Sequence, residues 1–230
     1  VNALAGSALP LAIVPMGTAN VLAIEIGLRA EARLIAETAL DGPIARIALG
    51  QVQGLGADHL PRRFTLMAGV GFDAEVVRTV DPRIKQRLGK LAYVLATLKL
   101  LLRYRTPRYI VHANGRQFAV GSVVLANGRH YGGAFVCAPD ARLDRPSLEL
   151  CLMQARGRRA IVRYALALAL GRLHRQHDVE IVATREAMIE GPAGDPVQGD
   201  GDILGVLPAR IAVAPETLLL AVPVSSPLLR

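Results

Sequence analysis

Short apolar runs separated by Gly, Pro and Asn dominate the chain after residue 43 and predict an antiparallel, β-rich domain. The strands that these runs predict are 44–52, 64–69, 109–113, 117–125, 135–138, 148–153, 179–182, 187–189, 211–214 and 218–222. Asn114 and Gly115 lie between two of the runs and predict a two-residue hairpin turn, because both turn positions need a positive φ.

The first 42 residues have a different pattern, which predicts a strand, a loop and two helices. The apolar run 9–14 predicts the strand, and residues 17–20 (GTAN) form a turn before helical patterns over 21–28 and 31–40. We therefore expect a domain boundary near residues 41–43 (DGP).

Two further helices interrupt the predicted strands. Over 83–105, leucines recur at steps of three and four while lysines and arginines occupy the other positions, which predicts a basic amphipathic helix. Such a helix can face an anionic lipid surface or simply cover the sheet with its charges in water. The second helix, over 158–174, is richer in Ala and Leu and is expected to pack against the sheet.

Composition narrows the classes of function. Of the 230 residues, 52% are hydrophobic, which excludes a disordered chain, and 27 basic against 19 acidic residues give a net charge of +8. Such a surface attracts phosphates, anionic lipid or nucleic acid, but with only 4% aromatic residues the chain has few stacking platforms, so nucleic acid is not expected. No apolar run reaches 18 residues, so no membrane-spanning helix is predicted. Cys137 and Cys151 are expected to be buried thiols in a reducing compartment.

Two segments could carry phosphate or acid–base chemistry. The turn 17–20 precedes a helix, where free backbone N–H groups favour a phosphate, although an ordinary connection has the same pattern. Residues 198–202 (QGDGD) place Asp200 and Asp202 two positions apart. In an extended segment both carboxylates would point to one side, where one could accept a proton and the other could hold a metal or orient its neighbour. A solvated acidic turn is the other interpretation.

Two more segments have both a functional and a structural interpretation. Asp73 follows Gly69 and Gly71, and is expected to cap a tight corner between a strand and a helix. In the long loop that follows residue 126, Asp140 and Asp144 are either turn formers or oxygen ligands for a metal ion. The chain contains no GxxxxGK[ST] segment, which excludes a P-loop nucleoside triphosphatase.

Four segments, taken together and in this order, resemble one family. They are 15–20 (PMGTAN), 68–74 (AGVGFDA), 125–141 (LANGRHYGGAFVCAPDA) and 198–202 (QGDGD). The family is the diacylglycerol kinase catalytic family of bacterial lipid kinases, which also includes sphingosine kinases. Its corresponding motifs read P-x-G-T-A-N, G-x-G-F-D-A, A-N-x-x-x-x-G-G-x-x-x-x-P-x-A and D-G-E.

The resemblance implies a fold of the class α/β plus β. Residues 1–42 would be the C-terminal part of an α/β nucleotide-binding domain. Residues 43–230 would form an antiparallel β-sandwich domain for the lipid substrate, with inserted helices and with the last residues returning to the first domain. The cleft between the two domains would be the site of reaction.

The activity implied is a Mg²⁺-dependent transfer of the γ-phosphoryl group of ATP to a lipid hydroxyl, such as that of diacylglycerol. By this resemblance Asp200 would be the general base, Asp202 its acidic partner, and Asp144 a metal ligand. Gly17, Thr18 and Asn20 would line the phosphates of the nucleotide. Chemistry of this type depends on positioning and charge neutralisation and needs no covalent nucleophile.

The expected partners are a lipid substrate at the membrane surface, ATP and anionic phospholipid. A homodimer is the open alternative to a monomer. The expected location is cytoplasmic, with peripheral association to the membrane.

Three departures from the family pattern leave alternatives open. We expect the family's Gly-Gly-Asp-Gly-Thr loop just before Val1, so the chain is expected to be truncated at the N-terminus. Val21 stands where many members have Asp, and Arg145 follows Asp144 where an acidic pair is expected. A lipid-binding or regulatory relative without catalysis is therefore one alternative, and a soluble nucleotide kinase, similar to the related NAD kinases, is another.

Overall fold

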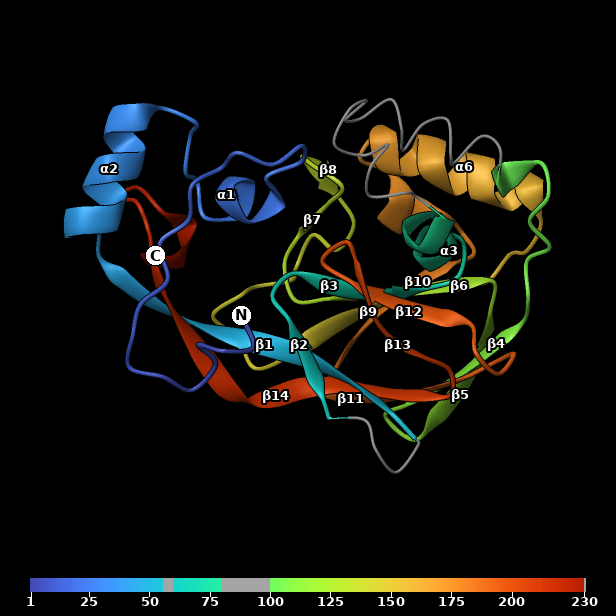
Figure 1. The fold of residues 1–230 in the computed structure, drawn as a ribbon. Helices are drawn as coiled ribbons and strands as arrows, with labels where there is room; N and C mark the ends of the chain where they lie inside the picture. Colours follow the sequence, from blue (N-terminus) through green and yellow to red (C-terminus); the bar gives the residue numbers. More distant parts are fainter. Residues whose placement is uncertain (56–59, 80–99, 230) are drawn as a thin grey trace.

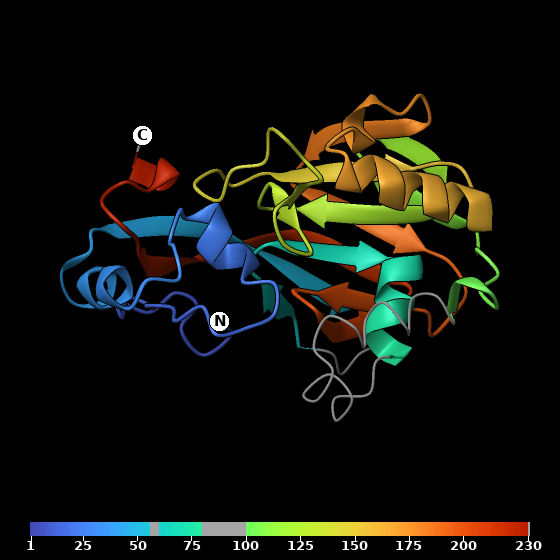
Figure 2. The ribbon, with the colours of Figure 1, turned by 90° about the horizontal axis from the view of Figure 1, so that it is seen from above.

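Two antiparallel sheets pack face to face, and helices cover the outer face of one of them (Figures 1 and 2). The computed structural model describes residues 1–55, 60–79 and 100–229. The first sheet has the strand order β2 (Arg62–Phe64), β1 (Ile44–Gly54), β14 (Ala209–Ala221), β11 (Glu186–Glu190), β4 (Tyr109–Ala113) and β5 (Arg116–Val120). The second has the order β10 (Val179–Thr184), β9 (Leu148–Met153), β6 (Ser122–Ala126), β3 (Met67–Val70), β12 (Pro196–Gly199) and β13 (Asp202–Val206).

Short helices and one small hairpin complete the described part of the chain. The helices are α1 (Val21–Glu25), α2 (Ala32–Asp41), α3 (Phe72–Thr79) and α6 (Arg158–Ala169), with 3-10 turns η1 (Leu173–Arg175) and η2 (Pro227–Leu229). The small hairpin pairs β7 (His130–Tyr131) with β8 (Phe135–Val136).

The alternation of apolar and polar residues along the strands produces two hydrophobic cores. Between the sheets, Phe64 and Tyr109 of the first sheet's strands pack with Leu125 and Leu150 of the second. On the other side of the second sheet, a second core joins Tyr164 of α6 to apolar residues of the sheet and of α1. The outer face of the second sheet is therefore covered, whereas the outer face of the first sheet has no helix over it in the described ranges (Figure 1).

The predicted strand over 9–14 is wrong. Only Leu11 pairs with β14, through one parallel bridge in which its N–H donates to Leu219 O at 2.8 Å and its carbonyl accepts from Ala221 N at 2.9 Å. This bridge nevertheless brings the end of β14 beside residues 1–42, close to the C-terminus (Figure 1).

Two predicted strands are each divided into two, and two others are joined. Residues 64–69 divide into β2 and β3, and residues 117–125 divide at Gly121, where the chain passes from the first sheet to the second. A Cβ at Gly121 would lie 2.5 Å from the carbonyl oxygen of Ala155, so only glycine fits there. The predicted strands 211–214 and 218–222 are one strand, β14, whose ends the pattern misjudged.

The predicted helices have different ends in the structure. The helix expected over 21–28 ends at Glu25, because Gly27 takes a φ of 75°. The helix expected over 158–174 is divided into α6 and η1. The corner between a strand and a helix that was expected at Asp73 leads into α3. Most of the basic helix expected over 83–105 lies outside the described residues.

Candidate active site

The turn between β12 and β13 holds Asp200 against the break between β2 and β3. Asp200 has a φ of 52°, in the left-handed region, and Gly201 follows with a φ of 90°. The Asp200 carboxylate accepts three backbone hydrogen bonds, from Thr65 N at 2.6 Å, Leu66 N at 2.9 Å and Met67 N at 3.1 Å. These N–H groups are available because the chain leaves the sheet at residues 65 and 66.

The environment of Asp200 favours proton uptake. Burial raises the pKa of the carboxyl group above its ordinary value, and the three N–H bonds counteract that increase only in part. The expectation that Asp200 and Asp202 point to one side of an extended segment is wrong, because residues 200 and 201 form the turn. Asp202 is the first residue of β13, pairs with Gly199 and is exposed.

A second carboxylate, that of the half-buried Asp73, lies in the segment that follows β3. Asp73 is in the first turn of α3, and its Oδ2 accepts hydrogen bonds from Gln198 Nε2 at 3.1 Å and Tyr131 OH at 3.3 Å. A Cβ at Gly69 would clash with this same carboxylate, so the glycine lets Asp73 lie over β3. Burial also raises the pKa of Asp73.

Gln198 connects the two carboxylates. Its Nε2 donates to Asp73, and its Oε1 accepts from Gly201 N at 3.2 Å, in the turn that positions Asp200. We call Asp73, Tyr131, Gln198 and Asp200 the carboxylate cluster. Asp200 is exposed and Asp73 is half-buried as whole residues, but desolvation of their carboxylates raises both pKa values. Two such carboxyl groups connected by one amide are the type of arrangement that marks a site for proton transfer.

Asp73 is the member of the carboxylate cluster to which sequence reasoning gave a structural role. The sequence signal was present, since a carboxylate follows two glycines at the end of a buried strand. Only the pairing of β12 with β3, which sets Gln198 opposite Gly69, shows that this carboxylate belongs with Asp200.

Hydrogen bonds to the buried Glu25 anchor α1 beside the cluster. Glu25 is 7% exposed, and its carboxylate accepts from Arg129 N at 3.0 Å and from His130 N at 3.1 Å, while His130 Nδ1 lies 2.5 Å away. His130 pairs with Val136 of β8 and precedes Tyr131 of the cluster in the chain. The residues 1–42 are thus attached directly to the hairpin that reaches Asp73.

Asn127 supports the site from inside the protein. It is fully buried, and its Nδ2 donates to Ala48 O at 2.8 Å and to Thr65 O at 2.7 Å, while its Oδ1 has no partner among the described residues. Asn127 therefore holds the residue that donates the shortest hydrogen bond to Asp200.

The predicted phosphate-binding turn is an exposed bend before a short helix. Asn20 has a φ of 47°, and its Nδ2 donates to Pro15 O at 3.1 Å rather than capping α1. Gly17 and Thr18 are exposed, and within the described ranges no hydrogen bond joins the turn to the carboxylate cluster. Their role at a nucleotide stays a prediction.

Asp144 is engaged by its neighbour. Arg142 Nε and Nη2 donate to its two carboxylate oxygens at 2.9 and 2.8 Å, and this pairing lowers the pKa of Asp144. Among the described residues there is no group of three or more His, Cys, Asp or Glu side chains placed to hold a metal ion. The described residues therefore do not fit a protein-bound Mg²⁺ site, and a cation at Asp144 would compete with Arg142 for the carboxylate oxygens.

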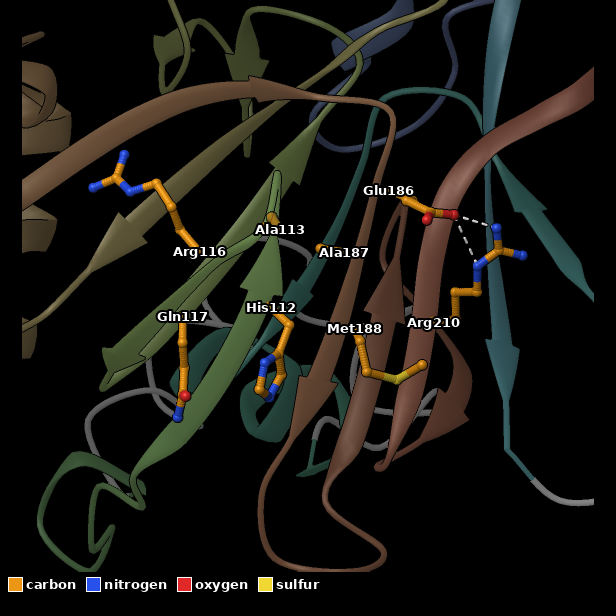
Figure 3. Close-up of a pocket in the computed structure, with 9 residues that line it drawn as sticks. His112, Ala113, Arg116, Gln117, Glu186, Ala187, Met188 and Arg210 are labelled. Carbon is orange, nitrogen blue, oxygen red and sulfur yellow. Dashed lines mark hydrogen bonds and ion pairs between the residues drawn. The ribbon is translucent and has the colours of Figure 1, made fainter.

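A groove of about 460 Å³ lies on the opposite side of the sandwich, on the bare face of the first sheet (Figure 3). His112, Met188 and Arg210 line it, and Figure 3 shows Glu186 and Arg210 pointing toward each other. The groove contains no member of the carboxylate cluster, so the hollow and the buried acids are separate features.

Comparison with known proteins agrees with this geometry. Residues 67–222 match the family model described as the YegS C-terminal NAD kinase beta sandwich-like domain, and residues 1–52 match the diacylglycerol kinase catalytic domain. A crystal structure of a diacylglycerol kinase from Bacillus anthracis str. Sterne is similar with a TM-score of 0.70 at 20% identity, covering 94% of this chain and 69% of that one. The expected fold class, a β-sandwich with part of an α/β domain, is thereby confirmed.

Sequence relatives identify the family. The chain is 30% identical over 219 residues to the diacylglycerol kinase of Mycobacterium tuberculosis (strain CDC 1551 / Oshkosh), covering 94% of this chain and 70% of that protein. It is also 30% identical over 231 residues to the protein named "Probable lipid kinase YegS-like" of Pseudomonas aeruginosa (strain PAO1), covering 96% and 70%. The fold is a β-sandwich with part of an α/β domain, and the chain belongs to the diacylglycerol kinase and YegS family of lipid kinases. None of its described helices has the length and apolar character needed to span a bilayer.

Proposed function

We propose that this protein transfers the γ-phosphoryl group of ATP to the hydroxyl of a lipid such as diacylglycerol, with Asp200 as the general base. The observation that carries the proposal is the carboxylate cluster, in which Asp200, an exposed residue whose hydrogen-bonded carboxylate has a raised pKa, lies in a turn beside an open glycine position. Nothing would contact a Cβ at Gly201 within 4 Å, so substrate can approach the turn.

The hydrogen bonds of Asp200 leave room for one more proton. A carboxylate has about four lone-pair positions, and the backbone N–H groups occupy two at Oδ1 and one at Oδ2. The Thr65 side chain also hydrogen-bonds to this carboxylate, and the lipid hydroxyl would take the remaining position at Oδ2 in its place when it gives up its proton. As that proton moves to Oδ2, the lipid oxygen forms a bond to the γ-phosphorus, the bond from that phosphorus to the bridging oxygen breaks, and ADP leaves.

The rest of the cluster positions the base. Gln198 fixes the turn through Gly201 and is itself fixed by Asp73, so the orientation of Asp200 depends on both residues. Asp202, exposed on β13, is the proposed acidic partner. The proposed donor is ATP with Mg²⁺ bound to its phosphates. In that form the phosphates supply metal ligands, so the metal does not need a site made of protein side chains alone.

The surroundings of Asp144 favour one alternative, a lipid-binding or regulatory relative that does not transfer phosphate. Asp144 is paired with Arg142, and the described residues offer no metal cluster. Such a protein would bind lipid and show no turnover.

The deciding experiment measures transfer of labelled phosphate from ATP with Mg²⁺ to a panel of lipid hydroxyls in mixed micelles. Asp200→Asn should lower kcat by about 10²–10⁴-fold, while the circular dichroism spectrum stays that of a folded protein. Glu186→Gln on the bare face is the matched control and should retain full activity. Turnover of Asp200→Asn at the wild-type rate would refute the assignment of the base. Lipid binding without turnover in the wild-type protein would favour the non-catalytic alternative.

A further inference from the structure

We propose that the exposed face of α6 docks this protein onto the surface of an anionic lipid bilayer. The inference rests on the proposed function only in that a lipid kinase has to reach a membrane. It comes from a surface that the carboxylate cluster does not use. We define the α6 face as Arg158, Arg159, Val162, Leu166 and Leu170.

The α6 face is apolar where a surface helix should be polar. The buried side of α6 is formed by Ala160, Tyr164 and Ala167, which pack in the core over the second sheet. On the other side Val162, Leu166 and Leu170 are 41%, 60% and 69% exposed. At about 100° per residue the five residues of the α6 face lie within about 120° of the helix circumference.

The charged residues around the α6 face are all positive. From residue 154 to residue 177 the chain contains six arginines and no Asp or Glu: Arg156, Arg158, Arg159, Arg163, Arg172 and Arg175. Arg163 is paired with Asp178, whereas Arg158 and Arg159 are exposed and form no ion pair within the described ranges. Exposed leucines beside arginines are the pattern of helices that lie in a membrane interface.

The helix also carries a shallow hollow of about 420 Å³, lined by Arg158, Arg159 and Arg163 together with Val162 and Leu166. Guanidinium groups bind phosphate oxygens through two parallel hydrogen bonds, and the apolar side chains next to them suit acyl chains. A phospholipid presents a phosphate group next to its acyl chains, whereas a soluble anion has no acyl chain.

The α6 face is connected to the site through the small hairpin. α6 contacts β8, whose Phe135 is 44% exposed, and Phe135 is the cross-strand partner of Tyr131. Tyr131 in turn donates to Asp73 of the carboxylate cluster. Docking through α6 would therefore set the bilayer against the elements that lead to the proposed base (Figure 2).

The experiment measures co-sedimentation of the protein with phosphatidylglycerol vesicles and with phosphatidylcholine vesicles. The double variant Leu166→Gln, Leu170→Gln should weaken binding to phosphatidylglycerol by about tenfold for each leucine. Arg158→Gln and Arg159→Gln should weaken it by roughly fivefold each, and only at low salt. The matched control is Leu40→Gln on α2, because Leu40 is also a helical leucine and is 82% exposed.

Two results would overturn the inference. One is equal binding by the α6 variants and the Leu40→Gln control. The other is a concentration-dependent dimer that the leucine variants abolish while vesicle binding is unchanged, because the face would then bind a second copy. Activity on a short-chain, water-soluble diacylglycerol separates the two proposals. Vesicle binding that depends on α6 without any such activity would uphold this inference and refute the proposed function.

Discussion

The two outer faces of the sandwich carry similar residue types in different environments. The face of the second sheet, covered by α3, α6 and the β7–β8 hairpin, holds Asp73 and Asp200 with raised pKa values. The bare face of the first sheet holds the groove and the Glu186–Arg210 pair, whose side chains are 58% and 46% exposed. A hollow alone does not make a site for acid–base chemistry, and the Glu186–Arg210 pair in the groove is open to water, which screens its charges.

The largest expected effect that tests this comparison is on catalysis. Asp73→Asn keeps an acceptor for Gln198 Nε2 and Tyr131 OH but removes the buried charge. Because Gln198 then loses its charged partner, the turn that orients Asp200 loosens, and kcat should fall by about 10²-fold. The measurement is phosphoryl transfer in mixed micelles, with KM for ATP unchanged.

A structural role for Asp73 alone makes a different prediction. It would leave the pH dependence of kcat in the same place, whereas a positioning role shifts the acid limb of the profile. An unchanged kcat in a folded Asp73→Asn protein would remove Asp73 from the site.

The next effect is on stability. Asn127→Leu leaves Ala48 O and Thr65 O without their buried donor, and should lower the free energy of unfolding by about 2–4 kcal/mol. Gln117→Leu changes the same kind of amide on the groove side, where the residue is exposed, and should change stability by less than about 0.5 kcal/mol. Urea denaturation measures both, and equal effects would show that the covered face has no special polar support.

Sequence patterns predicted the parts of the fold that depend on nearby residues. The strand over 148–153 has the predicted bounds, and α2 and the Asn114-Gly115 hairpin turn lie where expected, because each depends on residues that are close together in the sequence. Cys137 and Cys151 are buried and free, as predicted.

The parts that the sequence did not predict depend on distant residues. The predicted strand over 64–69 divides because Asp200, 135 positions away from Thr65, takes its N–H group. Asp73 becomes part of a site because Gln198, 125 positions away, donates to it. No periodicity within a window of ten or twenty residues contains this information.

Two carboxylates on the covered face should respond to pH in opposite directions. Arg163 and Tyr164 hydrogen-bond to Asp178 and lower its pKa far below the ordinary value, so the folded state binds fewer protons there. That stabilisation is complete above the ordinary carboxyl pKa and is lost as the pH falls. Asp178→Asn should therefore lower stability at pH 7 by about 2 kcal/mol, with the difference from wild type shrinking at acid pH.

Asp73 provides the opposite case. Its pKa is raised by burial, so the folded state binds more protons between the ordinary pKa and the raised one. At neutral pH the buried charge is a cost, and Asp73→Asn should increase the free energy of unfolding. The gain should shrink as the pH falls through the raised pKa. Thermal unfolding between pH 4 and 8 measures both variants, and the same sign for both would contradict the assignment.

The smallest expected effect concerns the bare face. Glu186→Gln breaks the ion pair with Arg210, but both side chains are largely exposed, so stability should change by less than about 0.5 kcal/mol. Phosphoryl transfer should be unchanged, because no hydrogen bond or ion pair in the described part of the chain joins Glu186 to a residue of the carboxylate cluster. A loss of transfer comparable with that of Asp200→Asn would mean that the groove takes part in the reaction. The comparison between the faces would then fail, since the raised pKa values of Asp73 and Asp200 would no longer distinguish the site from the hollow.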